Sequence, residues 1–168
     1  PGSLAVFNSN DIYPISADST LPFQQQRDLF YLSGVDQEES ILVLFPDCPK
    51  EKHREILFLK ETNEHIAVWE GEKLTKRVAF ETSGITTVYW LQDLEKVLFE
   101  MSSYCDTFYI NTNEHYRANL ETETREDRFT KGLLAKYPAH SVAKSNPILQ
   151  RLRAVKDPIE LDLMQHAC

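Results

Sequence analysis

Short apolar runs separated by polar turns recur along the chain, and the densest of them predicts a central strand. Ser40–Phe45 (SILVLF) is an almost unbroken aliphatic run that Pro46 and Asp47 end. A run of this kind, without alternating polar positions, favours a strand buried on both faces over a half-exposed one. We therefore expect it near the middle of a sheet.

Other short runs have the composition of strands. They are rich in β-branched, aliphatic or aromatic residues, and polar residues or glycine bound them. The predicted strands are Ser3–Phe7, Phe30–Leu32, Glu55–Leu59, Ile85–Trp90, Thr107–Ile110 and, as a candidate edge strand, Ser141–Ala143. After Phe30–Leu32 we expect a turn at Ser33-Gly34, because glycine adopts backbone angles that other residues avoid.

Apolar residues at helical spacing, together with capping residues, predict the helices. The clearest case is Gln92–Met101, where apolar residues recur at the spacing of an amphipathic helix; they are Leu94, Val97, Leu98 and Met101. Glycine marks the ends of two shorter helices. The other predicted helices are Asn63–Glu70 before Gly71, Leu74–Thr82 before Gly84, Thr124–Tyr137, and two that start at Asn146 and Asp157.

The last three helices carry clear boundary and face signals. Asn146-Pro147 combines an N-cap residue with proline at the first helical position. Asp157 followed by Glu160 has the spacing of a capping box. The helix at 124–137 has four apolar residues on one predicted face, Phe129, Leu133, Leu134 and Tyr137.

The order of these elements predicts the fold class. Strands and helices alternate after Glu55, and two or three strands are adjacent before it. This order is typical of an α/β, three-layer domain in which helices flank a mixed central β-sheet. The 168 residues are enough for one domain with a substantial core, whereas two domains would be cramped.

Composition and charge restrict the possible partners and the compartment. The chain has 18 basic and 26 acidic residues, a formal net charge of −8, and affinity for nucleic acid or an anionic membrane depends instead on clustered lysine and arginine. Cys48, Cys105 and Cys168 are far apart, which favours reduced thiols and a cytoplasmic location over a disulfide framework. No apolar run has the roughly 18 to 20 residues that a membrane span needs.

The sequence contains no recognisable catalytic or metal-binding motif. None of the five histidines has another histidine or a cysteine three or four residues away, so the spacing of metal ligands is missing. The acidic residues from Glu121 to Asp127 are interleaved with arginine, which is more typical of a solvated helix start than of an acid–base pair. These patterns indicate an acidic α/β domain without an active site of its own.

Two features stay open on these grounds. Gln24, Gln25, Gln26 and Arg27 form an unusually polar segment, and their side chains either satisfy buried backbone groups in a loop or form a functional surface. Trp69 lies at the end of a short predicted helix. A tryptophan there suits a core or interface anchor as well as a ligand contact.

The segment Pro22–Gly34 (PFQQQRDLFYLSG) resembles a signature of the N-terminal domain of Xaa-Pro aminopeptidases, the aminopeptidase P branch of the pita-bread metallopeptidases. Gln24 stands where this family usually has arginine, and Arg27 where it has serine, so contacts of the usual arginine do not carry over. Further stretches agree with the family in order and spacing. They are Ile56–Phe58 followed by Val68–Gly71, then Ser83–Ile85, and finally Leu152–Leu161.

This resemblance implies a creatinase N-terminal domain of RNase H-like fold over residues 1–156, with 157–168 starting the first helix of an absent C-terminal catalytic domain. It also implies a first helix upstream of Pro1, so that Pro1-Gly2 would end a helix; a cloning remnant is the other reading. In the family the catalytic domain holds two divalent metal ions, usually manganese. No catalytic residue, metal ligand or cofactor is therefore expected in this chain itself.

The implied function is that of a non-catalytic domain of an enzyme that releases the N-terminal residue preceding proline. The implied partners are the chain's own catalytic domain, further copies in a dimer or tetramer, and the peptide substrate through the full enzyme. Trp69 becomes a substrate-side or interface contact, and Gln24, Gln25, Gln26 and Arg27 become domain-interface candidates. Two alternatives remain: a non-enzymatic binding module like the histone-chaperone relatives of this fold, which the acidic charge would suit, or the N-terminal domain of a prolidase or creatinase.

Overall fold

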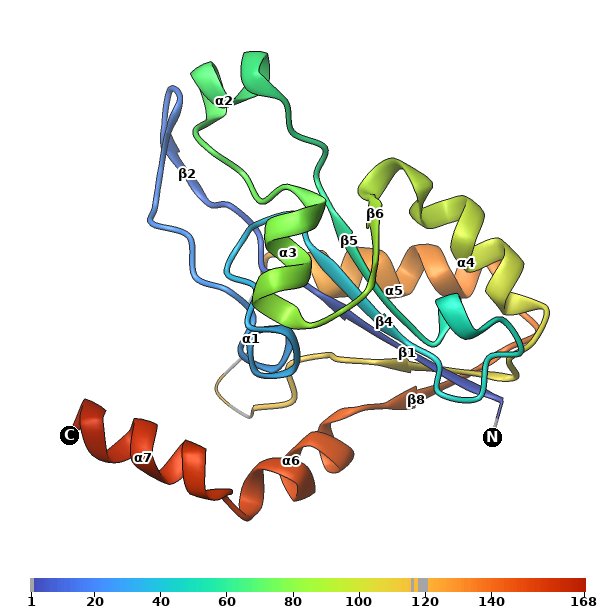
Figure 1. Ribbon diagram of the computed structural model, residues 1–168. Helices are drawn as coiled ribbons and strands as arrows, with labels where there is room; N and C mark the ends of the chain where they lie inside the picture. Colours follow the sequence, from blue (N-terminus) through green and yellow to red (C-terminus); the bar gives the residue numbers. More distant parts are fainter. Residues whose placement is uncertain (1, 116, 118–120) are drawn as a thin grey trace.

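A six-stranded mixed sheet forms the middle layer of the computed structural model, which describes residues 2–115, 117 and 121–168 (Figure 1). The strand order is β6-β5-β4-β1-β7-β8, and β4 runs antiparallel to both of its neighbours while the other adjacent pairs are parallel. This arrangement confirms the predicted mixed sheet. The strands are β1 (Ser3–Asn8), β4 (Ile41–Leu44), β5 (Glu55–Leu59), β6 (Thr87–Trp90), β7 (Thr107–Ile110) and β8 (Ser141–Lys144).

The central position of β4 follows from its apolar sequence. Ile41 and Val43 pack into the core on one face of the sheet, and Leu42 packs into the core on the other. Side chains alternate between the faces of a strand, so a strand covered on both sides needs apolar residues at every position. The prediction of a doubly buried central strand is confirmed.

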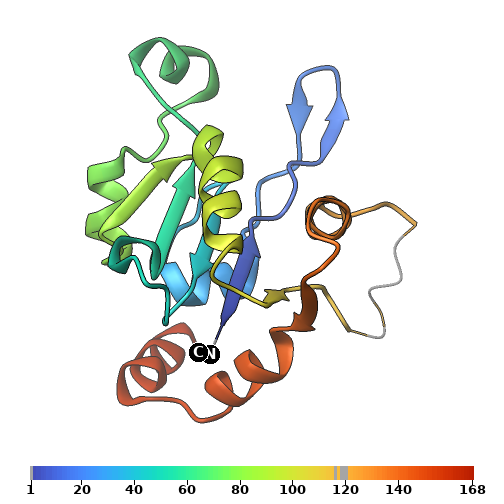
Figure 2. The ribbon, with the colours of Figure 1, turned by 90° about the vertical axis from the view of Figure 1, so that its right-hand side faces the viewer.

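Helices cover both faces of the sheet (Figure 2). On one face, α4 (Leu94–Ser102) and α5 (Arg125–Lys136) contribute buried residues such as Met101 and Leu133 to one core cluster. On the other face, Leu29, Ala79 and Leu149 enter a second cluster. Their helices are α1 (Arg27–Ser33), α3 (Lys76–Ser83) and α6 (Asn146–Ala154). The fold is thus a three-layer α/β domain, as predicted.

Peripheral elements extend from two opposite ends of the molecule. At one end, α2 (Glu64–Glu70) and a hairpin of β2 (Pro14–Ser16) and β3 (Ser19–Thr20) project from the body (Figures 1 and 2). At the other end lie α6 and the last helix, α7 (Pro158–Ala167). We call α6 and α7 together the C-terminal arm. Two short 3-10 turns complete the fold, η1 (Glu51–His53) and η2 (Leu91–Asp93).

The prediction of a strand at Phe30–Leu32 is wrong, because these residues belong to α1. The Gln26 side chain accepts hydrogen bonds from the backbone of Asp28 and Leu29 and so caps the helix, and Gly34 ends it with φ 68°. A run of three apolar residues does not distinguish a strand from one helical turn, and capping decides between them. Gly34 has the positive φ that was predicted for it, but it ends a helix instead of forming a turn between two strands.

Smaller differences concern faces and boundaries. Leu134 is exposed instead of facing the core with Leu133, because the sheet contacts a narrower stripe of α5 than the apolar pattern predicts. The N-cap of α6 is Ser145, one residue before the predicted Asn146. The capping box of Asp157 and Glu160 is present as predicted. The hairpin of β2 and β3 was not predicted, since its residues are exposed and lack an alternating apolar pattern.

Two predictions fall partly outside the described residues. Pro1 is not among the described residues, so the interpretation of Pro1-Gly2 as a helix end rests on the sequence alone. The predicted loop after Ile110 includes 116 and 118–120, which are also not described. Within the described ranges, no helix has both the length and the apolar character to cross a membrane.

Candidate interface groove

A groove of about 820 Å³ runs between the polar segment with α1 on one side and the C-terminal arm on the other. It brings together two stretches that are far apart in the chain, Pro22–Gly34 and Leu152–Leu161, and both carry the family resemblance. The lining residues are Gln24, Gln25, Arg27, Phe30, Tyr31, Asp36, Arg153, Lys156, Glu160, Leu163 and Met164.

Gln25 turns its amide toward the body of the protein. Its Nε2 donates hydrogen bonds to the carbonyl oxygens of Val35, at 3.1 Å, and Gln37, at 2.8 Å. Its Oε1 accepts a hydrogen bond from the backbone N–H of Gln26 at 2.8 Å. Gln25 therefore satisfies polar backbone groups of the loop before β4, which is the first of the two roles predicted for this segment.

Gln26 serves the helix that follows it. Its Oε1 lies 2.6 Å from the backbone nitrogen of Asp28 and 2.9 Å from that of Leu29, and accepts a hydrogen bond from each. The first N–H groups of a helix have no partner within the helix, so this side chain stabilises the start of α1. Gln26 does not line the groove.

Gln24 and Arg27 face outward instead. Both are exposed and line the groove. Gln24 is held through its backbone, because Asn10 Nδ2 donates a 2.9 Å hydrogen bond to the Gln24 carbonyl oxygen. The Arg27 guanidinium has no hydrogen bond or ion pair within the part of the chain that the structure describes. These two side chains are thus available to a partner surface.

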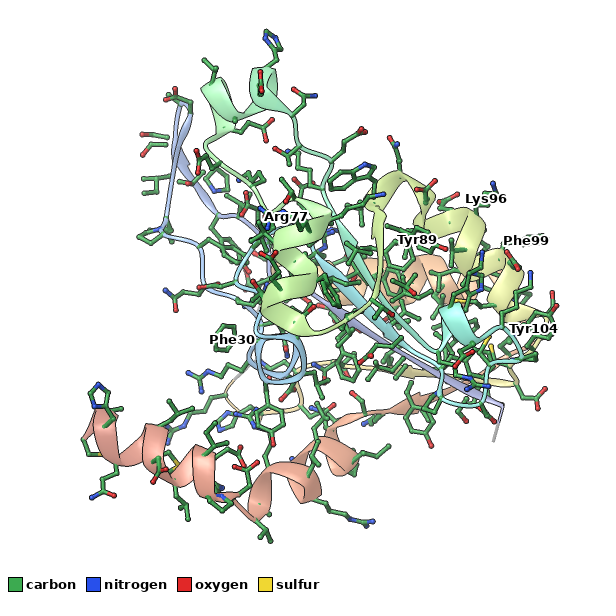
Figure 3. All side chains as sticks on the ribbon, in the orientation of Figure 1. Phe30, Arg77, Tyr89, Lys96, Phe99 and Tyr104 are labelled. Carbon is green, nitrogen blue, oxygen red and sulfur yellow. The ribbon has the colours of Figure 1, made fainter. Side chains whose placement is uncertain are left out.

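Apolar side chains contribute to both walls of the groove. Phe30 extends from α1, where it is 49% exposed (Figure 3). Leu163 and Met164 extend from α7, and both are more than half exposed. Burial of such surface against a partner would be favourable, at about 25 cal/mol per Å² of apolar area. The groove therefore has the mixed character of a protein interface, with apolar walls and charged edges.

Polar contacts connect the two walls. Arg153 donates a 2.7 Å hydrogen bond to Asp28 Oδ1 and also lies over the Tyr31 ring, with 5.0 Å between its guanidinium carbon and the ring centroid. Partial burial and the neighbouring Glu160 carboxylate raise the pKa of Tyr31. Because Arg153 and Glu160 belong to α6 and α7, these contacts connect the arm to α1.

Trp69, the other predicted site residue, lies far from the groove. It belongs to α2, at the opposite end of the molecule (Figure 1). Its side chain lies outside the described residues. The structure therefore does not bring Trp69 together with Gln24, Gln25, Gln26 or Arg27.

In the described part of the chain, the side chains that could bind a metal ion do not form a cluster. In the described ranges, no group of three or more His, Cys, Asp or Glu side chains is placed to hold a metal ion, so these residues do not fit a dinuclear metal centre. All three cysteines are free thiols. Burial, reinforced by Asp106, raises the pKa of Cys105 to about 11, so at neutral pH this buried side chain remains an unreactive thiol.

The role of several groove residues was missed in the sequence. Phe30 and Tyr31 were predicted to lie in a strand, and no contact was predicted for Arg153 or Lys156. The signal that could have located the groove was the pairing of the two motif stretches that these residues occupy. Sequence motifs without catalytic residues often mark a packing surface. A single sequence does not show that two such motifs lie side by side in the fold.

Comparison with known proteins identifies the family. The family described as "Aminopeptidase P, N-terminal domain" matches residues 1–109. The Xaa-Pro aminopeptidase of Escherichia coli is 24% identical over 99% of this chain and 38% of that protein. Human Xaa-Pro aminopeptidase 3 is 26% identical over 95% of this chain and 31% of that protein. The chain thus spans about a third of the length of these relatives.

Solved structures confirm the fold. The aminopeptidase P of E. coli superposes with a TM-score of 0.78 at 23% identity, over 99% of this chain and 38% of the other. A Bacillus anthracis structure described as an aminopeptidase P superposes with a TM-score of 0.83 at 21% identity, over 98% and 39%. Together with the family match over residues 1–109, this shows that the chain belongs to the aminopeptidase P N-terminal domain family.

Proposed function

We propose that this chain acts as the non-catalytic N-terminal domain of a metal-dependent Xaa-Pro aminopeptidase. The family match carries the proposal, and the relatives that align with nearly the whole chain are named as peptidases of this specificity. The parent enzyme would release the N-terminal residue of a peptide whose second residue is proline. The domain would contribute to oligomer contacts and to the shape of the substrate pocket.

Catalysis would belong to a region beyond residue 156, with α7 as its first helix. The relatives extend over about three times the length of this chain, which leaves room for such a region. One solved relative is a zinc-substituted E. coli aminopeptidase P in complex with product, which supports a divalent metal in the parent enzyme. We propose two such ions, usually manganese in this family. When bound, they would activate water for attack on the peptide bond.

The groove would receive the catalytic region of the same protein. Gln24 and Arg27 are exposed there, and Gln25 and Gln26 hold the backbone that presents them. Phe30, Leu163 and Met164 would be buried by the contact. We also propose a dimer or tetramer in the cytoplasm, with Trp69 at the end of the molecule opposite the groove as the substrate-side or subunit contact.

The test compares this chain with the natural full-length protein. The full-length protein is expected to hydrolyse a peptide with proline in second position after addition of Mn²⁺. This chain is expected neither to hydrolyse the peptide nor to bind Mn²⁺ in calorimetry. In the full-length protein, amide exchange at Gln24–Tyr31 should slow relative to this chain if the groove is the domain interface.

Two results would contradict the proposal. Hydrolysis of Xaa-Pro dipeptides but not of longer peptides would favour a prolidase. Binding of histones at physiological salt, without metal binding or hydrolysis, would favour the chaperone-like alternative.

A further inference from the structure

Asn111 occupies a junction where three helices approach the sheet. It follows the last residue of β7 and is 5% exposed. Its backbone N–H donates a 3.1 Å hydrogen bond to Glu126 Oε1 of α5, and its Nδ2 donates a 3.2 Å hydrogen bond to Asp28 Oδ2 of α1. Its Oδ1 accepts a 2.9 Å hydrogen bond from Ser145 Oγ, at the start of α6. One buried side chain thus connects α1 and α6.

These contacts reach both ends of α6. Ser145 is its N-cap residue, and Asn111 holds it directly. Arg153 lies in the last turn of α6 and bonds Asp28 Oδ1 at 2.7 Å, while Asn111 bonds the other oxygen of the same carboxylate. Asp28 is therefore held between Asn111 and Arg153. Hydrogen bonds to a charged group are among the stronger ones in proteins, and a shared carboxylate couples them.

Apolar packing holds the C-terminal arm only weakly. Leu149 is the buried residue of α6, whereas Ile148, Leu152 and Val155 are all more than half exposed. No residue of α7 is buried, although every residue of that helix is described. An element with few buried apolar contacts can open without unfolding the rest of a protein. The polar contacts around Asn111 then determine where the arm lies.

We propose that Asn111 is a positioning residue that fixes the C-terminal arm on the body through Ser145 and the Asp28–Arg153 pair. Asparagine suits this position because its amide donates to a carboxylate and accepts from a hydroxyl at once. Aspartate would place a second carboxylate next to Asp28 and lose the donor. The biological consequence rests on the proposed function, in which the arm leads into the catalytic region and its angle sets that region's placement.

The experiment uses this chain and follows the arm separately from the core. Cys168 is exposed at the end of the arm while Cys48 and Cys105 are buried, so a thiol-reactive fluorophore labels the arm. Amide exchange read by mass spectrometry reports on 146–167 and on the strands. Asn111→Ala is compared with Asn113→Ala in the same loop, and Arg153→Met with Arg151→Met on the same exposed helix.

Asn111→Ala and Arg153→Met are each expected to speed exchange in the arm by roughly tenfold to a hundredfold, the equivalent of losing one or two hydrogen bonds to a charged group. Anisotropy of the Cys168 label should fall, and exchange in β4 and β5 should not change. The effect of the double variant should be smaller than the sum of the two single effects, because both variants remove a contact to Asp28.

Asn113→Ala and Arg151→Met should match the unmodified chain. The proposal is overturned if Arg153→Met and Arg151→Met behave alike. It is also overturned if Asn111→Ala speeds exchange in β4 and β5 as much as in the arm, because Asn111 would then support only global stability. Neither result depends on peptidase activity, so the proposed function and this inference can fail separately.

Discussion

Neighbouring residues of the polar segment have different roles. Gln25 and Gln26 use their amides within the chain, one to satisfy the loop before β4 and the other to cap α1. Gln24 and Arg27 are exposed at the groove. Composition alone does not separate these roles, because all four residues carry polar groups that can bind backbone or partner equally well.

Replacement of Gln26 by alanine should destabilise the chain, and replacement of Gln24 should not. Gln26→Ala removes the acceptor for two backbone N–H groups of α1, which typically costs about 1 kcal/mol and lowers Tm by roughly 2–4 °C in a chain of this size. Gln24→Ala, the matched control, should stay within about 0.5 kcal/mol. Thermal unfolding by circular dichroism checks both, and equal Tm values would refute the capping role.

At the scale of elements, the first turns of α1 and α5 each place a carboxylate at the same edge of the sheet. Asp28 and Glu126 each lie in the first turn of their helix, where the helix dipole favours negative charge. Glu126 accepts hydrogen bonds from Asn8 Nδ2, at 2.7 Å, and from the Asn111 backbone. Burial nevertheless outweighs these bonds and raises the pKa of Glu126, with a smaller contribution from Asp127.

The sign of this shift predicts how Glu126→Gln changes stability with pH. A carboxyl group whose pKa is raised in the folded state binds more protons folded than unfolded, so its contribution is lost as pH rises from about 4.5 through the folded pKa. Glu126→Gln removes this pH-dependent loss of stability, because glutamine does not ionise. Asn8 Oδ1, which is buried without a partner in the described structure, could then accept from the new amide after rotation of the Asn8 side chain.

The Tm difference between Glu126→Gln and the unmodified chain should therefore become more favourable to the variant between pH 4 and pH 7. A change of about 1 kcal/mol corresponds to roughly 2–4 °C. Thermal melts across this pH range measure it, with Glu121→Gln as an exposed control. A difference that is constant with pH would show that Glu126 has an ordinary pKa.

At the scale of the whole molecule, the two regions with proposed contacts lie at opposite ends. The groove lies with the C-terminal arm, and α2 projects with the hairpin at the other end (Figure 1). In α2, Val68 is 77% exposed, as expected of a helix that packs little against its own domain. Under the proposed function, the domain would contact the catalytic region at one end and another subunit at the other.

Trp69→Ala in the full-length protein tests the second contact. If Trp69 reaches a substrate pocket, kcat/KM should fall by roughly tenfold or more, as for an aromatic residue at the centre of an interface, while Tm stays within a few degrees. Val68→Ala is the neighbouring control on the same helix. Unchanged kinetics together with a large fall in Tm would make Trp69 a core residue.

Local patterns along the chain were enough to predict the layers of this protein. Three local signals were sufficient: the unbroken apolar run of β4, the alternation of helices and strands, and the capping box of α7. Such signals predict structure because backbone geometry and burial act on neighbouring residues. Family membership was likewise predicted from motifs in the chain.

Features that depend on contacts between distant residues could not be predicted from these patterns. The helical state of Phe30–Leu32 follows from a cap and from packing of Leu29 under the sheet. The groove exists because 153–164 folds back beside α1. The position of Asn111 between Asp28 and Ser145 joins residues 83 and 34 positions away from it. Such contacts arise when separate elements pack on one sheet, and no local pattern records which of them will meet.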